Sequence, residues 1–161
     1  MLKDLTKGNE AKTIIAQNKG ANKLDRVQRG IISAVIIITV FCAIISALVV
    51  IFARPLLGIF IKAEELEVIR IGVQYLRIVG IFYCLIGYLF MFYGLYRGFG
   101  KVGISIILTV ISLGSRVVLA YSLAPVPAIG LVGIWWAIPI GWALADITGT
   151  LFLRKIQMGE A

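Results

Sequence analysis

The chain has no histidine, only two cysteines and few charged side chains among its 161 residues. Without histidine it has neither a His-based metal site nor a His general base. Cys42 and Cys84 both lie inside apolar runs, which is typical of small buried hydrophobic residues and not of a disulfide or a metal site. The sequence also lacks a nucleophile–base group, a phosphate-binding glycine loop and a cluster of metal ligands. We therefore expect no enzyme, no cofactor and no bound metal.

Apolar side chains are what the sequence has in excess. Hydrophobic residues make up 60% of the chain and charged residues 15%, against about 45–50% and about 25% in soluble proteins. The mean hydropathy is +1.00. A soluble fold of this size exposes too much surface to hide so many apolar side chains. This composition disfavours a soluble enzyme, a disordered chain and a DNA-binding domain.

The positive net charge has two possible interpretations. Sixteen Lys and Arg against eight Asp and Glu give +8, which could serve a nucleic-acid binder or the cytoplasmic loops of a membrane protein. Seven of the sixteen lie in the first thirty positions, and most others lie beside apolar runs. We therefore expect the lipid bilayer as the partner, and no nucleic acid.

Four continuous apolar runs predict an all-α membrane protein with four transmembrane helices. About 20 helical residues, rising about 1.5 Å each, cross the hydrocarbon core of about 30 Å. The predicted spans cover residues 31–53, 78–96, 102–123 and 129–153. We expect a membrane domain over residues 31–155, between a basic cytoplasmic segment (1–30) and a cytoplasmic tail (156–161).

The connector between the first two spans, residues 56–77, has a pattern of its own. Its apolar side chains recur at helical spacing, and charged or amide side chains take most other positions from Glu64 onward. The apolar face consists of Leu66, Ile69, Val73 and Leu76. This pattern predicts an amphipathic helix that lies at the membrane interface.

The distribution of lysine and arginine predicts the orientation of the chain. With the N-terminus inside, the cytoplasmic side carries eleven basic residues and the outer side four. The eleven are the seven in residues 1–30 together with Arg97, Lys101, Arg154 and Lys155. Because cytoplasmic loops carry the excess of Lys and Arg, we expect a multi-pass protein of the cell (plasma) membrane with both termini in the cytoplasm.

Two charged residues inside the predicted spans are candidates for function, since a charge at mid-helix costs about 2.5–3.5 kcal/mol on insertion scales. From the helical rise, Arg116 lies about 10 Å from the outer end of its span and Asp146 about 10 Å from the inner end of the next. The two charges are then about 11 Å apart in depth. Each could face an aqueous cavity or a polar cluster. Alternatively, Arg116 snorkels outward and Asp146 reaches inward to Arg154 or Lys155.

The fourth predicted span carries small residues at every fourth position. They are Gly133, Ala137, Gly141, Ala145 and Gly149. In lipid such a stripe lets two helix backbones approach closely, so we expect it to face another helix. Trp135, Trp136 and Trp142 are expected at lipid-facing or interfacial positions. Pro139 removes a backbone hydrogen bond and should kink this helix, either as a static bend or as a hinge.

Short motifs follow one another along the chain in a fixed order. Ala16-Gln17-Asn18-Lys19-Gly20-Ala21 is followed by Arg26, and Tyr96-Arg97-Gly98-Phe99-Gly100 ends the second span. Gly130-Leu131-Val132-Gly133-Ile134-Trp135 opens the fourth span. Their order and spacing resemble the multidrug and toxic compound extrusion (MATE) transporters over about residues 13–155.

The resemblance implies that the four spans are the last four helices of a six-helix lobe, the second of two. The family exports cationic or amphipathic compounds in exchange for H⁺ or Na⁺, by alternating access between two lobes. Since the first lobe and its acidic coupling residue are absent, the resemblance implies a truncated or split-gene product that is not active alone. Its partner would be the remaining lobe or another copy.

Two other functions stay open at this point. The chain could be a relative of the lipid-linked saccharide flippases of the same superfamily. It could also be a small structural or partner-binding membrane protein that transports nothing. The sequence does not discriminate among substrates or coupling ions.

Overall fold

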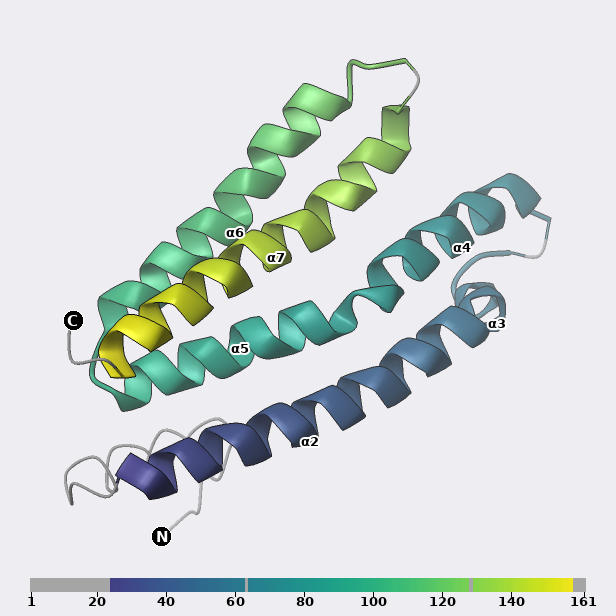
Figure 1. Cartoon of the computed structure of the whole chain (residues 1–161). Coiled ribbons are helices and arrows are strands. Elements are labelled where there is room, and N and C mark those ends of the chain that lie inside the picture. Colours follow the sequence, from purple (N-terminus) through teal and green to yellow (C-terminus); the bar gives the residue numbers. More distant parts are fainter. Residues whose placement is uncertain (1–23, 63, 128, 158–161) are drawn as a thin grey trace, which may run out of the picture.

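The computed structural model describes residues 24–62, 64–127 and 129–157, and within these ranges the chain is helical almost throughout. The helices are α2 (Leu24–Ile51), α3 (Ala53–Gly58), α4 (Leu66–Ile81), α5 (Tyr83–Gly98), α6 (Val102–Leu123) and α7 (Gly130–Gln157) (Figure 1). The prediction of an all-α membrane protein is confirmed.

Three of these helices are long and apolar enough to cross a membrane by themselves. They are α2 over Arg26–Ile51, α6 over Val102–Leu123 and α7 over Gly130–Ile156. Helices α4 and α5 meet these criteria only as a pair, bent by 50° at the break between them. The described residues therefore provide three spans, or four if the bent pair crosses as one.

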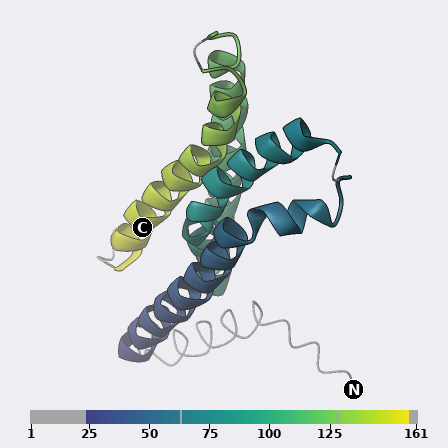
Figure 2. The same cartoon turned by 90° about the vertical axis from the view of Figure 1, so that its right-hand side faces the viewer.

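The helices run back and forth between two ends of the molecule (Figure 1). The start of α2, the α5–α6 connection and the end of α7 lie together at one end. From there α4 and the α6–α7 hairpin diverge, as Figures 1 and 2 both show. Because the start of α2 and the end of α7 lie at the same end, the described helices fit an even number of crossings. Which side is cytoplasmic stays a prediction.

The break between α4 and α5 lies at Phe82, inside the predicted second span. Helix α5 alone has 16 residues, which rise about 24 Å, less than the hydrocarbon core. The amphipathic segment thus does not end before the span: α4 continues to Ile81 and forms half of the bent pair. At the break, the Ser46 hydroxyl of α2 donates to the Gly80 carbonyl at 2.6 Å. This bond gives a backbone acceptor a partner where the helix is interrupted.

The core lies between α5 and α7, with α6 against them. Its most buried side chains are Tyr96, Leu108 and Ala145, each with no exposed surface. The Tyr96 hydroxyl donates a hydrogen bond to the Gly149 carbonyl and so joins α5 to α7. Helix α2 joins this core only near its start, where Val27 is buried, and exposes many of its other apolar side chains. A Thr39–Tyr88 hydrogen bond of 2.8 Å holds it against α5. This core fixes the height at which α6 and α7 meet, and therefore the position of the charged residues.

Candidate functional site

The small-residue stripe of α7 lies against neighbouring helices, as its spacing predicts. A Cβ atom added at Gly141 would lie 2.7 Å from the Ser112 carbonyl oxygen of α6, and one added at Gly149 would lie 2.9 Å from the Phe92 ring of α5. A Cβ atom added at Gly133 would lie 2.5 Å from the Ile129 side chain, one turn earlier, and 2.8 Å from Leu123 of α6. The two remaining members of the stripe, Ala137 and Ala145, are buried. The stripe thus brings the α6 and α7 backbones together at the level of Ser112.

Trp142 does not lie at a lipid-facing or interfacial position as expected. Its side chain is only 4% exposed and belongs to the core. Spacing shows the reason: Trp142 lies seven residues after Trp135 and seven before Gly149, so all three share the inward face of α7. Trp135 packs edge-on against Tyr75 of α4, with ring centroids 6.1 Å apart. Trp136 stays largely exposed at 41%.

The Arg116 side chain turns inward, so it does not snorkel to the near end of α6. Its guanidinium carbon lies 5.1 Å from the centre of the Trp142 ring, within the range of a cation–π contact. Its Nη2 donates to the Ser112 hydroxyl at 3.1 Å. Ser112 lies one turn earlier in α6, further from the Leu123 end that snorkelling would approach. The buried Nε has no hydrogen-bond partner.

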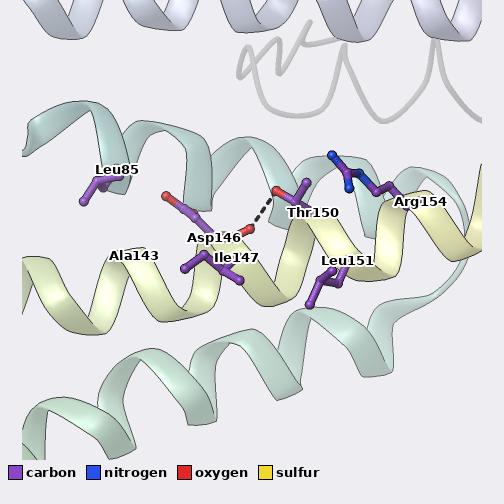
Figure 3. Close-up of a pocket in the computed structure, with 7 residues that line it drawn as sticks. All are labelled: Leu85, Ala143, Asp146, Ile147, Thr150, Leu151 and Arg154. Carbon is purple, nitrogen blue, oxygen red and sulfur yellow. Dashed lines mark hydrogen bonds between the residues drawn. The ribbon is translucent and has the colours of Figure 1, made fainter.

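Asp146 is buried, with 9% of its surface exposed, and neither carboxylate oxygen has a hydrogen-bond partner. It lines an open, shallow cavity of about 380 Å³ between Leu85 of α5 and the strip of α7 from Ala143 to Arg154. Figure 3 shows the carboxylate extending toward Leu85, while Arg154 lies further along α7. Within the described ranges the one ion pair joins Arg70 and Glu67. The expectation that Asp146 reaches Arg154 or Lys155 is therefore wrong for this structure.

The two intramembrane charges lie closer in depth than the sequence suggested. Because Gly141 contacts Arg116 and Ser112 directly, Arg116 lies level with Gly141. Asp146 follows five residues later, about 7.5 Å along the helix. The earlier value of about 11 Å assumed that both helices begin and end at the same depth. Here α7 extends to Gln157, past the predicted boundary. The charges are still not paired with each other.

The other motif residues lie at helix ends. Arg97 and Gly98 close α5, and Gly100 follows in the turn to α6 with φ of 75°. Gly130 opens α7 with φ of 50°, a conformation that glycine adopts without the steric cost of a side chain. Gln17, Asn18, Gly20 and Ala21 lie outside the described residues. The motifs in the described part thus lie where helices end or begin and the chain turns.

Sequence reasoning missed two neighbours of these charges. Ser112 could have been found, since it lies four residues before Arg116 on the same helix face. Leu85 faces Asp146 from another helix, so no local pattern marks it. In the described part of the chain no three metal-ligating side chains gather. The arrangement offers a carboxylate without a hydrogen-bond partner beside a cavity and a guanidinium without an ion-pair partner on an aromatic ring.

Comparison with known protein families decides what kind of membrane protein this is. The family model MatE matches residues 9–122, well over half of the chain. The chain belongs to the MATE family. MATE proteins are membrane transporters, and this agrees with the apolar helices of the fold. Arg116 lies within the matched residues, whereas α7 with Asp146 lies beyond them. No curated protein and no solved structure matches the chain.

Proposed function

We propose that the chain is part of a MATE-type secondary transporter that exports cationic or amphipathic compounds across the cell membrane in exchange for H⁺ or Na⁺. In this proposal Asp146 binds the cation. The supporting observation is its burial beside a cavity with both carboxylate oxygens unpartnered. A carboxylate in apolar surroundings is favoured when a proton or a bound cation neutralises it. The cavity gives such a cation room next to the carboxylate.

The side of α5 that faces the cavity is apolar. Leu85 offers no hydrogen bond, and the Thr150 hydroxyl is already bound to the Asp146 backbone carbonyl at 2.8 Å. Arg154 lies at one end of the cavity (Figure 3), and its positive charge would repel a cation there. The carboxylate therefore provides the negative charge of this cavity. Its removal should abolish cation binding.

We further propose that this chain, whose described helices offer at most four crossings, does not transport by itself. Carriers of this type work by moving two repeats around a shared central site. The described helices supply only part of one such repeat. A second copy or the remaining lobe would have to complete the cavity.

Carbodiimide labelling tests Asp146 directly. Dicyclohexylcarbodiimide is an apolar reagent that attacks protonated carboxyl groups in membranes. We expect the purified full chain in nanodiscs to gain one adduct on the α7 peptide, which Asp146→Asn abolishes and Asp146→Glu retains. If Na⁺ is the bound ion, NaCl should slow labelling relative to choline chloride. If H⁺ is the bound ion, labelling should depend on pH and not on the Na⁺ concentration.

The same experiment has outcomes that contradict the proposal. One is the absence of any adduct on Asp146 across the pH range in which the protein stays folded. The other is labelling of Asp146 that neither Na⁺ nor pH alters. Glu64 is exposed near the start of α4, so Glu64→Gln serves as the matched control and should leave the α7 adduct unchanged.

A further inference from the structure

The guanidinium of Arg116 is a second unpaired charge, and the cation site at Asp146 does not use it. Arginine carries several N–H donors in a planar fork that fits a carboxylate or phosphate. In the described part of the chain Arg116 makes one hydrogen bond, from Nη2 to Ser112, and its buried Nε has no partner. The side chain as a whole is half-buried.

The position of the guanidinium is fixed from two sides. Ser112 holds one edge through the hydrogen bond of 3.1 Å, and the Trp142 ring supports one face at 5.1 Å. The Trp142 side chain is itself fixed in the core at 4% exposure. A cation held in this way loses little conformational freedom when an anion arrives, which favours binding.

No carboxylate in the described residues neutralises this cation. Asp146 lies about 7.5 Å further along α7, and no ion pair joins the two. A charge within a membrane span that has no partner is costly, so it normally marks a ligand path or a missing counter-charge. We propose that Arg116, with Ser112 and Trp142, binds the anionic group, a phosphate or a carboxylate, of an amphipathic molecule.

The surroundings of Arg116 favour an amphipathic anion over a small hydrated one. Next to the Ser112–Arg116 face, α6 exposes a row of apolar side chains that runs from the level of Arg116 toward the start of the helix. These are Val117, Leu113, Val110 and Ile106, each at least 54% exposed. A ligand with its anionic head at Arg116 can lay an apolar chain along this row. A free inorganic anion would lose its hydration with no such compensation.

Quenching of Trp142 fluorescence tests this site, because bromine quenches tryptophan on close contact. The reporter is the full chain with Trp135→Phe and Trp136→Phe, in a neutral maltoside detergent, so that Trp142 alone emits. The probe is an alkyl phosphate brominated on its chain, compared with the brominated alcohol of the same length. We expect the phosphate to quench at clearly lower concentration than the alcohol.

Removing the charge should remove this preference. Arg116→Gln should raise the half-quenching concentration of the phosphate by about tenfold or more, since it deletes charge-assisted hydrogen bonds. The alcohol should quench this variant as it does the reporter, which shows that Trp142 stays in place. Arg116→Lys keeps the charge without the planar fork. Its half-quenching concentration for the phosphate should lie between those of the reporter and of Arg116→Gln. Arg77→Gln, which removes an exposed arginine of α4, should change nothing.

The source of the anionic group is distinguished by competition. Inorganic phosphate that displaces the brominated probe indicates a free anion as the ligand, and failure to displace it indicates an amphiphile. Two results overturn the proposed site. One is equal quenching by the phosphate and the alcohol in the reporter itself. The other is a preference for the phosphate that survives Arg116→Gln. Neither result depends on transport, so failure here leaves the cation site at Asp146 standing.

Discussion

At the scale of single residues, function and packing meet on the inward face of α7. Gly141 lets α6 approach, and this approach sets Arg116 over Trp142. Asp146 follows on the same helix beside its cavity. Because Trp142 is buried, its replacement should also destabilise the protein.

Gly141→Ala should lower the stability of the folded protein. The new Cβ would lie 2.7 Å from the Ser112 carbonyl oxygen, and overpacking of this kind costs about 1–3 kcal/mol. Gly114→Ala is the matched control, since nothing lies within 4 Å of its Cβ position. That change should be neutral or stabilising, because alanine is the better helix former by about 1 kcal/mol. Thermal unfolding in detergent measures both, and equal midpoints would show that Gly141 is not at a tight contact.

At the scale of helices, much of the structure could be predicted from the sequence. The hydropathy pattern predicted α6 at Val102–Leu123, the range that the structure shows. It also predicted α7 within a few residues at each end. The break at Phe82 could not be predicted from local sequence. The Gly80 carbonyl beside it is hydrogen-bonded by Ser46, which belongs to a different helix, α2. For the same reason the sequence did not reveal that Arg116 turns toward Trp142: local spacing gives a helix face but not the neighbour it meets.

The Ser46 hydrogen bond at the helix break should contribute measurably to stability. Ser46→Ala leaves the Gly80 carbonyl without its 2.6 Å partner, and interhelical bonds in membrane proteins contribute about 0.6–1.7 kcal/mol. Ser33→Ala, on the exposed part of α2, should lower the stability of the folded protein less than Ser46→Ala does. If unfolding in a denaturing detergent gives the same stability for both variants, this bond does not hold α4 against α2.

The bent pair α4–α5 decides the number of crossings. If the pair spans the membrane once, Glu64 before α4 and Lys101 after α5 lie on opposite sides. Single cysteines at these positions, in a chain with Cys42 and Cys84 replaced by alanine, can be labelled with an impermeant maleimide. We expect Lys101→Cys to react from the cytoplasmic side, and Glu64→Cys and Val126→Cys from the outside. Labelling of Glu64→Cys and Lys101→Cys from one side, with Val126→Cys reacting from the other, would show that the pair is re-entrant.

At the scale of the whole molecule, we propose that the chain supplies part of a MATE transporter. The family match covers residues 9–122, and the described helices offer at most four crossings. Alternating access needs two repeats around a common site. We therefore expect insertion into the membrane without transport when this chain is the only one supplied.

Dye efflux tests this central claim most directly. The chain is expressed in energised cells that lack their own pumps and are loaded with ethidium, beside an empty vector and the Asp146→Asn variant. The account predicts that the chain reaches the membrane fraction and that efflux stays at the level of the empty vector. Efflux above that level, abolished by Asp146→Asn, would contradict it and show that these four helices form a working carrier.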